Sequence, residues 1–478
     1  MYVGGLDIGT SGCKIALYDE EGSFVKSACK EYNVRRFSGL HEVDAREIFD
    51  SVKCVIKELH EKNISAIAVT SFGETFTMLD ENDEVCSPSM LYTDPRGRGE
   101  CRELSEAFGE DNLARLTGTK PHEMYSIAKI LWIKRNMPEN FKRARRILLM
   151  QDYIVYMLTG KAQIDYSLAA RTAVFDIKKK RYIDSILDYC GVSKELFSEP
   201  VASGTIAGKI KPVLAEELSL EKETVLVSGC HDQIAALTGA GVFESREAMD
   251  GTGTVECVPV VFDSIPDDPS LYKYGYSVVP HINGKYACYV LSYCGGATLK
   301  WFRDSFTDNT YAEIDAAVPE KPTDILILPH FAGAATPYMD SSSKAAIVGL
   351  TFEHTKYDIC KALMEGTAYE IAINLDILKR YEISPNKLTA TGGGARSPVW
   401  MQIKADILGV PLSSLDTEEV GAAGTAYLAG RAVGMYTKGK AVSSLRKVYT
   451  PNAANAEFYA AQLERYKKMY PAVKDILS

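Results

Sequence analysis

The sequence predicts an α/β protein whose two halves share one order of elements. Two observations support this fold class. A strand, a turn of small residues with two glycines, and a second strand open each half, at residues 2–18 and 247–262. In both halves, helix-like stretches then alternate with short apolar runs. The hairpins share no long identity, so the repeat is structural. We place the boundary at 245, which gives domains 1–244 and 245–478.

The spacing of apolar residues and of chain breakers places the elements of each half. In the first half we expect strands at 2–8, 14–18 and 24–30, an amphipathic helix over 44–60, buried strands at 64–71 and 224–229, and mostly helix across 100–190. In the second half we expect strands at 276–280, 286–293, 325–329 and 388–392, and helices from about 296, over 355–380 and over 453–470. Phe458, Leu463 and Tyr466 are expected to dock the last helix.

Composition narrows the class of protein. The 478 residues are 46% apolar and carry a net charge of -9, which argues against non-specific binding to nucleic acid or anionic lipid. No apolar run is long enough to span a membrane, and no secretory signal opens the chain. The 11 cysteines are scattered, without a C-x-x-C pair, as is typical of buried thiols in a reducing compartment. We therefore expect a cytoplasmic protein.

The first hairpin has the features of a phosphate-binding turn. Its tip, residues 9–12, exposes backbone N–H groups with little side-chain bulk, and such a concavity binds anions. Thr10 and Ser11 add hydroxyl donors, and Lys14 adds a positive charge. Asp7, just before the turn, could hold a metal ion that carries phosphate oxygens. Glycine-rich turns are more often only turns, and this alternative stays open for a single hairpin.

Two further glycine clusters strengthen the expectation. The turn 251–254 repeats the first hairpin in the second domain, and two such turns facing each other would clamp a polyphosphate in a central cleft. Gly392, Gly393 and Gly394 stand between a strand and a helix, where they would let a flat ring approach the backbone. Neither a P-loop nor a dinucleotide-binding fingerprint occurs, so a dinucleotide fold is disfavoured.

A candidate base follows a buried strand in the segment SGCHDQ, residues 228–233. Ligands of open α/β sheets gather at the carboxyl ends of strands, and Asp232 could there accept a proton from an attacking hydroxyl. Alternatively, Asp232 only caps the following helix. His231 is a weaker candidate, because no His or Cys stands at metal-ligand spacing from it.

A series of motifs runs along nearly the whole chain: GLDIGTSGCKIALYD (5–19), GLHEVDA (39–45), LYTDPRGR (91–98), QDYIVYMLTG (151–160), GCHDQ (229–233), DGTGTVE (250–256), the stretch 333–371, TGGGARSPVWMQ (391–402) and VGAAGTAYLAG (420–430). In this order they resemble the FGGY carbohydrate kinases of the ribonuclease H-like, actin-like ATPase superfamily. The resemblance implies two ribonuclease H-like domains around a central cleft. It also implies ATP as phosphoryl donor and Mg²⁺ as cofactor.

The resemblance assigns roles to residues of this sequence. Asp232 matches the general base and Asp7 the acid near magnesium. The positions that match nucleotide or phosphate contacts are Thr10, Ser11, Lys14, Gly251, Thr252, Gly296, Lys300, Gly393 and Ser397. The positions that match the sugar pocket are Glu74, Tyr92, Met124, Asp232 and Gln233.

The sugar pocket departs from the subfamily patterns. Glycerol kinases have Arg where this chain has Gly73, and their substrate-side Tyr aligns with Met124. Xylulokinases have Met-His at Gly73-Glu74, and often Asn at Gln233. Altered hydrogen-bonding groups change the choice of sugar. We expect phosphorylation of a primary hydroxyl of a ketopentose such as xylulose, with glycerol or another polyol as the alternative. Glu74 could instead only form a salt bridge, and Tyr92 could only pack.

A second class of protein shares the two-hairpin architecture, namely actin-like filament subunits and chaperone-type ATPases. Asp232, Gln233 and Glu74 favour the kinase, because they have a purpose only if a hydroxylated substrate binds. Members of the kinase family often dimerise, so a homodimer is an expectation from the resemblance. The expected partner is thus a small sugar or polyol.

Overall fold

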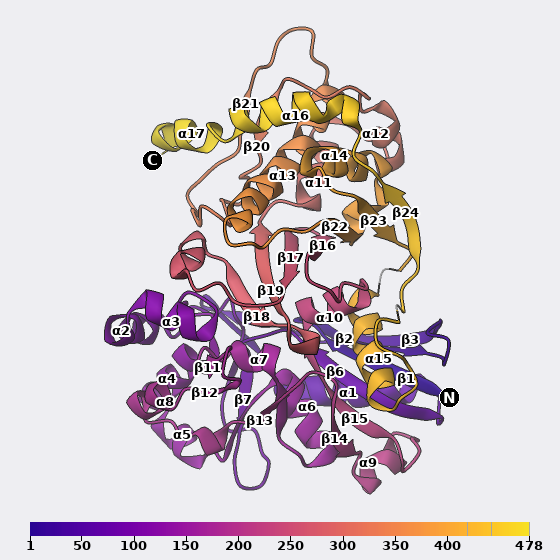
Figure 1. Ribbon diagram of the computed structural model, residues 1–478. Coiled ribbons are helices and arrows are strands. Elements are labelled where there is room, and N and C mark those ends of the chain that lie inside the picture. The colour runs from indigo at the N-terminus through magenta and orange to yellow at the C-terminus, as the bar shows by residue number, and fades with distance from the viewer. Residues whose placement is uncertain (418, 441, 478) are drawn as a thin grey trace. The chain divides into compact units, whose positions relative to one another are not determined.

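The computed structural model describes residues 1–417, 419–440 and 442–477 (Figure 1). The described chain forms two compact units. The first comprises Met1–Phe243, Val279–Gly284 and Glu419–Ser443, and the second comprises Glu244–Val278, Lys285–Glu418 and Ser444–Ser478. The segment 419–443 thus lies beyond the boundary expected at 245 but packs with the first unit. The domain division by sequence stays a prediction.

The first unit is built on a six-stranded sheet. Its strands, from one edge to the other, are β14 (Thr205–Lys209), β15 (Val225–His231), β6 (Ile64–Ser71), β1 (Tyr2–Ile8), β2 (Gly12–Tyr18) and β3 (Phe24–Glu31). Strands β15, β6 and β1 are parallel, whereas the remaining pairs are antiparallel.

The second large sheet has seven strands. They are, in order, β18 (Ser277–Pro280), β19 (Tyr286–Ser292), β17 (Glu256–Phe262), β16 (Glu247–Thr252), β22 (Lys387–Thr391), β23 (Leu412–Leu415) and β24 (Leu445–Tyr449). Strands β16, β22 and β23 are parallel, as β1, β6 and β15 are in the first sheet. In each sheet the first strand of this parallel trio also forms an antiparallel hairpin with the strand that follows it in the chain, so the expected repeat of element order is confirmed.

Helices and short strands complete each unit. The helices of the first unit are α1 (Ala45–Glu58), α2 (Arg98–Phe108), α3 (Glu110–Thr117), α4 (Ser126–Asn136), α5 (Pro138–Arg143), α6 (Met150–Thr159), α7 (Tyr166–Ala170), α8 (Asp184–Cys190), α9 (Pro212–Glu217), α10 (Asp232–Gly239) and α15 (Val420–Ala432). Those of the second are α11 (Gly296–Phe306), α12 (Tyr311–Ala317), α13 (Lys356–Lys379), α14 (Pro398–Leu408), α16 (Ala453–Tyr466) and α17 (Met469–Leu477). The short strands are β4 (Arg35–Phe37), β5 (Leu40–Val43), β7 (Phe76–Leu79), β8 (Ser89–Met90), β9 (Arg146–Leu149), β10 (Gln163–Asp165), β11 (Phe175–Asp176), β12 (Arg181–Tyr182), β13 (Glu199–Val201), β20 (Leu326–Leu328) and β21 (Ala346–Val348).

Helix α1 shows why the sequence pattern was informative. Asp44 caps it by accepting a hydrogen bond from the backbone N–H of Arg46. Ile48, Val52 and Val55 recur at helical spacing and are fully buried in the core that this helix forms with the first sheet. The amphipathic helix expected over 44–60 is confirmed.

Helix α15 joins the first unit through glycine contacts. A Cβ added at Gly5 of β1 would overlap the carbonyl oxygen of Ala422, and one added at Gly239 of α10 would overlap that of Val420. Gly424 of α15 lies in the same way against the carbonyl oxygen of Ala235. Only glycine permits such close backbone approach. Figure 1 shows this helix of the C-terminal part of the chain among β1, β6 and α10.

The strand expected at 325–329 is confirmed as β20, which pairs with β21. One expectation for the second unit needs correction. The final helix is two helices, α16 and α17. Of the side chains expected to dock it, Tyr466 is buried, Leu463 is half-buried and Phe458 is 38% exposed, while Tyr459 and Gln462 are buried as well. The buried face is set by hydrogen bonds of tyrosine hydroxyls to buried carboxylates, such as that from Tyr459 to Glu365.

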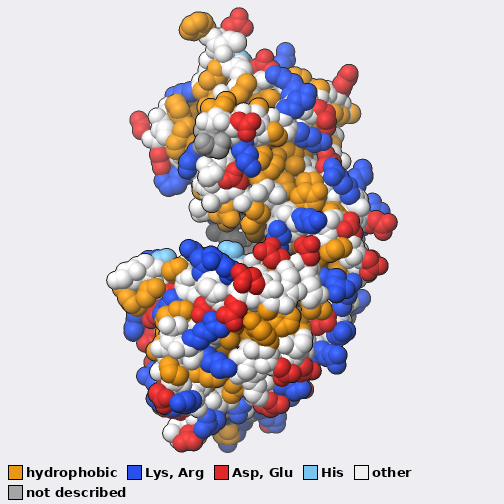
Figure 2. All heavy atoms as spheres, turned by 90° about the vertical axis from the view of Figure 1, so that its left-hand side faces the viewer, with side chains coloured by type: hydrophobic (Ala, Val, Ile, Leu, Met, Phe, Trp, Pro, Cys, Tyr) orange, Lys and Arg blue, Asp and Glu red, His pale blue; other side chains and the backbone are white. Residues whose placement is uncertain are grey.

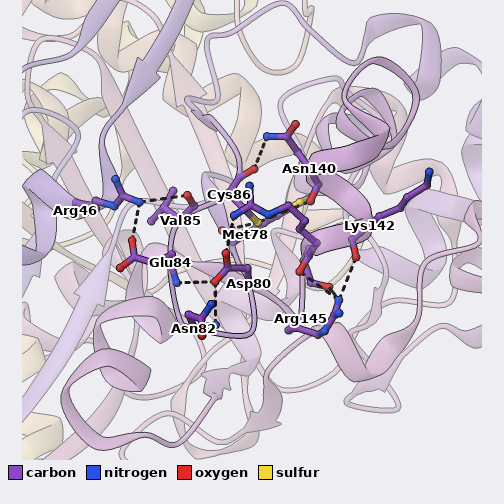
Figure 3. A network of polar contacts seen from close by, with 12 residues as sticks. Arg46, Met78, Asp80, Asn82, Glu84, Val85, Cys86, Asn140, Lys142 and Arg145 are labelled. Atoms are coloured by element: carbon purple, nitrogen blue, oxygen red, sulfur yellow. Dashed lines mark hydrogen bonds and ion pairs between the residues drawn. The ribbon is translucent and has the colours of Figure 1, made fainter.

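A polar network fixes the loop that follows β7 in the first unit (Figure 3). Asp80 accepts hydrogen bonds from the backbone N–H groups of Asn82 and Glu84, and Arg46 of α1 pairs with the Glu84 carboxylate. Asn140 of α5 donates to the carbonyl oxygen of Cys86. These contacts supply partners for backbone groups that no strand pairs.

The surface carries charges of both signs. On the face that Figure 2 shows, Lys and Arg side chains are interspersed with Asp and Glu side chains, with no broad field of one sign. Within the described ranges, every helix is too short or too polar to cross a bilayer.

Candidate active site

Asp7, the last residue but one of β1, lies in an acidic setting. Burial, together with the negative charges of Asp232 and Glu419, raises the pKa of Asp7 to about 7, while Lys14 opposes the shift. Lys14 forms an ion pair with Glu419, just before α15. A Cβ at Gly421 would lie 2.8 Å from Asp7 Oδ2, so glycine at that position makes room for the carboxylate. Asp7, Lys14 and Asp232 are therefore brought together.

The tip of the first hairpin is tied at its base and open at its end. The N–H of Gly9 donates to the carbonyl oxygen of Gly12 at 2.8 Å, and the Tyr32 hydroxyl donates to the carbonyl oxygen of Gly9. Thr10 is half-buried and Ser11 is exposed. The tip thus keeps the small, polar surface that an anion-binding turn needs.

The backbone before Asp232 leaves the regular sheet. The register of β15 against β6 shifts between Ser228 and His231, which is a bulge of the kind that re-aims side chains near active sites. Side chains satisfy the freed backbone groups. The Thr70 hydroxyl donates to the carbonyl oxygen of Cys230, and the His231 N–H donates to Ser167 Oγ at 2.8 Å. Asp232 therefore projects from a fixed turn.

Asp232 is the first residue of α10, and His231 holds the N-cap position. The alternative that Asp232 only caps the helix is not what the structure shows. Its side chain is 37% exposed, and burial raises its pKa to about 6, against a hydrogen bond from Gln233 and the charge of Arg171. His231 Nε2 lies 3.2 Å from Asp232 Oδ1. Burial and Arg171 lower the pKa of His231 to about 3, so the imidazole is neutral.

Glu74 forms a salt bridge, the alternative that the sequence left open. Its carboxylate accepts hydrogen bonds from Nε and Nη2 of Arg171, and both side chains are less than one-tenth exposed. The backbone of Glu74 has φ of 64°, and its carbonyl oxygen accepts from the Ser126 hydroxyl at 2.7 Å. Glu74 therefore engages Arg171 through one carboxylate oxygen, and its contact with a sugar stays a prediction.

Tyr92 remains a candidate sugar contact, because 42% of it is exposed. The charged residues after it are used within the protein. Arg96 pairs with Asp94 and Glu42, and buried Lys129 donates to the carbonyl oxygens of Asp94 and Arg96. These bonds fix the loop that carries Tyr92. Two other predicted sugar contacts, Met124 and Gln233, are half-buried.

The second hairpin stands on a buried ionic cluster. Lys404 Nζ of α14 lies 2.6 Å from Asp250 Oδ2, from Glu256 Oε1 and from Thr252 Oγ1. Burial and the charge of Asp250 raise the pKa of Glu256 to about 8, although Lys404 opposes this. The Thr252 hydroxyl also bonds Asp250 at 2.8 Å. Any contact of Thr252 with phosphate is therefore left to its backbone.

The glycine clusters of the second unit pack on this hairpin. The N–H of Gly296 donates to the carbonyl oxygen of Gly253 at 2.7 Å. A Cβ at Gly392 would lie 2.6 Å from the carbonyl oxygen of Thr252, and Gly394 meets the side chain of the same residue. At Gly393 nothing lies within 4 Å. Gly251, Thr252, Gly296 and Gly393 are thus brought together, and Gly393 keeps an open side for a ligand.

Two predicted nucleotide contacts have partners elsewhere. Lys300 pairs with Asp304, one turn further along α11. Ser397 caps α14, accepting from the N–H of Trp400 at 3.1 Å and donating to Asp315 at 2.8 Å. Their nucleotide roles stay predictions that require these bonds to be exchanged or shared.

A pocket of about 280 Å³ lies beside Gly393, within the second unit. It stands at the carboxyl ends of the parallel strands β22 and β23, and its lining includes Gly392, Gly393, Arg396, Asp416 and Arg446. Guanidinium groups and exposed glycine backbone are suited to phosphate and ribose oxygens.

Comparison with known proteins places the chain. Residues 2–239 match the N-terminal domain of the FGGY family of carbohydrate kinases, and residues 252–433 match its C-terminal domain. The chain belongs to the FGGY family of carbohydrate kinases. This FGGY kinase is therefore a phosphotransferase that acts on a sugar, and the expectation from the motifs is confirmed.

The relatives of this FGGY kinase have low sequence identity to it, but the alignments cover most of both chains. A xylulose kinase of Staphylococcus epidermidis is 27% identical, with 99% of this chain and 97% of the relative covered. A gluconokinase of Bacillus subtilis is 26% identical, with 92% and 88% covered. The crystal structure of a ligand-bound xylulose kinase from Lactobacillus acidophilus aligns with a TM-score of 0.90 and 26% identity, over 99% of this chain and 98% of that one. The ribonuclease H-like, actin-like ATPase fold is thereby confirmed.

Several residues of the site escaped the sequence analysis. Arg171, Lys404 and Glu419 lie 97, 154 and 405 positions from their partners Glu74, Asp250 and Lys14. No local spacing signals such pairs. The nearest signal was chemical, since a carboxylate expected to be buried needs a cation.

Proposed function

We propose that this FGGY kinase transfers the terminal phosphoryl group of ATP to a primary hydroxyl of a small neutral sugar, a ketopentose such as xylulose. Asp232 acts as the general base. The observation that carries the proposal is the setting of Asp232, a partly exposed carboxylate on a bulged strand end with a pKa of about 6. Above that pH it is ionised and able to accept a hydroxyl proton.

The reaction depends mainly on positioning. Phosphoryl transfer passes through a loose transition state, so little proton transfer is needed before the bond to the sugar oxygen forms. Asp232 orients the hydroxyl by accepting its hydrogen bond and takes the proton late. Neutral His231, 3.2 Å away, adds no positive charge that would weaken the carboxylate as a base.

The donor set around Asp7 fits a divalent cation. Burial and two neighbouring carboxylates raise the pKa of Asp7. The carboxylates create a local excess of negative charge, which a cation would neutralise. The described residues contain no cluster of three or more His, Cys, Asp or Glu side chains that could hold a metal ion. Phosphate oxygens and water would therefore complete the shell. Bound there, Mg²⁺ supplies charge neutralisation of the phosphates.

Backbone groups are proposed to hold the nucleotide. Thr10, Ser11 and Gly251 offer small turns for phosphate oxygens, and Lys14 offers a charge that is shared with Glu419. Gly393, with its open side and adjacent pocket, is suited to the nucleoside. ATP is the donor that the family membership implies.

The charge near Asp232 bears on the sugar. Arg171, the cation that acts on the pKa of Asp232, is already paired with Glu74. A carboxylate-bearing sugar acid would need a cation of its own. This favours a neutral substrate such as xylulose over gluconate. Tyr92, which is 42% exposed, is proposed to pack its ring against the sugar carbons.

A gluconate kinase is the second candidate, because the Bacillus subtilis gluconokinase is about as similar as the xylulose kinases are. Glycerol and other polyols remain the alternative raised by the sequence. The distribution of cysteines, all 11 of them free thiols, supports our proposal that the kinase works in the cytoplasm. Homodimerisation stays a prediction.

A coupled assay for ADP release over xylulose, ribulose, glycerol and gluconate tests the proposal. We expect the highest kcat/KM with a ketopentose, and a phosphomonoester at its primary carbon by phosphorus NMR. A higher kcat/KM with gluconate would show that the substrate is a sugar acid and not a neutral sugar. ADP release that no sugar stimulates would overturn the proposed function.

A further inference from the structure

The Glu74–Arg171 pair joins the segment after β6 to the end of α7. Glu74 follows β6, and Arg171 is the C-cap of α7. One carboxylate oxygen accepts from both Nε and Nη2 of the guanidinium, and the exposed fractions of the two side chains are 5% and 7%. The Arg171 guanidinium also lies 5.0 Å from the centre of the Tyr125 ring. The charge is therefore fixed in position.

The pair reaches the base through close packing. A Cβ at Gly73 would lie 3.1 Å from both Arg171 Cγ and His231 Nε2, so the arginine stem and the imidazole both pack against that glycine. His231 Nε2 in turn lies 3.2 Å from Asp232 Oδ1. Helix α7 also holds the turn directly, because Ser167 Oγ accepts from the His231 N–H and donates to Asp165 at 2.7 Å.

The Glu74–Arg171 ion pair places a buried positive charge near Asp232 and His231. An unpaired guanidinium would be costly to bury, and Glu74 offsets that cost. The remaining field of Arg171 acts on two neighbours in the same sense, since it lowers the pKa of both Asp232 and His231. Two apolar side chains would fill the space without acting on either group.

We propose that the Glu74–Arg171 pair is a positioning device for Asp232: Glu74 holds the guanidinium in place, and Arg171 packs with His231 on Gly73 and so sets the charge beside the turn that carries Asp232. The inference rests on the proposed function, because it gives Asp232 the role of base. It also assigns Glu74 a role through Arg171.

The titratable groups around Asp232 come from several elements. They are Arg171 after α7, Cys230 and His231 at the end of β15, Glu74 after β6, Asp7 near the end of β1, and Glu419 and Lys14, which act on Asp7. Of these, the variants below change only Glu74 and Arg171, so the charges of the phosphate-binding side stay constant.

The test is the pH profile of kcat/KM for the sugar that the wild-type kinase phosphorylates. Arg171→Met should move the acid limb to higher pH by about one unit, the effect of losing a nearby opposite charge. Glu74→Gln should move it to lower pH, because the arginine charge is then unopposed. Arg171→Lys should leave the limb close to that of the wild type. Arg143→Met, which removes a cation of the same unit paired with Asp80, is the matched control and should not move it.

Opposite shifts in the first two variants support the proposal, since loss of structure would not displace one limb upward and the other downward. Limbs that stay at the wild-type pH in folded Arg171→Met and Glu74→Gln overturn it. If Arg171→Met alone does not fold, the double variant with Glu74→Gln removes both charges and should show a smaller upward shift, because Arg171 acts on the pKa of Asp232 more strongly than Glu74 does.

Potentiometric difference titration separates this inference from the proposed function. The protons bound by each variant are compared with those bound by the same variant carrying Asp232→Asn, which reports the titration of Asp232 without any turnover. A displaced titration in a kinase that no sugar stimulates would sink only the proposed function. An undisplaced titration in an active kinase would sink only the positioning role.

Discussion

Asp232 combines burial with access: its side chain is 37% exposed, and its pKa is raised to about 6 by burial. A base must be unprotonated to accept the hydroxyl proton, so protonation below that pH removes activity. We predict that kcat/KM for the sugar falls about tenfold per pH unit below about pH 6 and is level above it. Initial rates between pH 5 and pH 8, at saturating nucleotide and metal, measure this. A limb near pH 4, where an ordinary aspartate titrates, would contradict the role of burial.

Gly421 leaves room for Asp7, because a Cβ there would lie 2.8 Å from Oδ2. Gly421→Ala should displace the carboxylate. A misplacement of about 1 Å costs up to ~100-fold in rate, and the Mg²⁺ concentration for half-maximal rate should rise. Steady-state kinetics with varied Mg²⁺ measure both effects. Gly99→Ala, at a helical glycine with no atom within 4 Å, is the control. An unchanged Mg²⁺ dependence in Gly421→Ala would separate Asp7 from the metal.

Single residues also show how much of the candidate site could be predicted from the sequence. Asp7, Lys14 and Asp232 were selected by motif, and the structure brings them together. Glu74 and Ser397 were selected in the same way, yet each is engaged by a partner, Arg171 or Asp315, that lies 97 or 82 positions away. A motif identifies a residue type at a position. The partner that its polar atoms find is decided by the fold.

At the scale of elements, α10 and α15 meet at reciprocal glycines. A Cβ at Gly239 would overlap the carbonyl oxygen of Val420. Gly239→Ala must separate the two helices, and such overpacking costs about 3 kcal/mol. Gly99→Ala should be neutral or slightly stabilising, because alanine is the better helix former. Urea unfolding of both variants measures the difference. Equal stability would mean that the helices yield without cost.

The second hairpin depends in the same way on Lys404. Its ammonium lies 2.6 Å from oxygens of Asp250, Glu256 and Thr252, and all these side chains are buried. Lys404→Met leaves buried carboxylates unpaired, which costs about 3–5 kcal/mol. We also predict a higher KM for ATP, because the turn 251–254 loses its support. Adding Glu256→Gln should recover part of the stability, and failure to do so would argue against an ionic origin.

Elements with strong local patterns were predictable, and those fixed by distant contacts were not. The strand 64–71 was found to the residue, since the apolar run Ala66–Val69 lies at its centre. The start of the final helix and the burial of Tyr466 were predicted, whereas the burial of Tyr459 was not. There, the hydroxyls of Tyr459 and Tyr466 reach the buried carboxylates Glu365 and Glu370, and polar partners of this kind leave no trace in apolar periodicity.

At the scale of the whole molecule, the repeat of element order follows from the sequence because each half carries its own hairpin and its own parallel strands. The packing of the segment 419–443 with the first unit does not follow from the sequence. It depends on Gly5, Gly239 and Gly424, each of which contacts the backbone of a residue far away in the sequence. Only the fold brings these pairs together. A glycine in a helix is usually interpreted as a weak point, whereas here it marks a backbone contact.

The central claim is that Asp232 is the base for phosphoryl transfer to a sugar. The most direct measurement is sugar-stimulated ADP release at pH 7.5 by the wild-type kinase and by Asp232→Ala, with sugar binding followed by calorimetry. We predict that the variant binds the sugar but turns over about 10²- to 10⁴-fold more slowly. Turnover within about tenfold of the wild type, with sugar binding intact, would contradict the account.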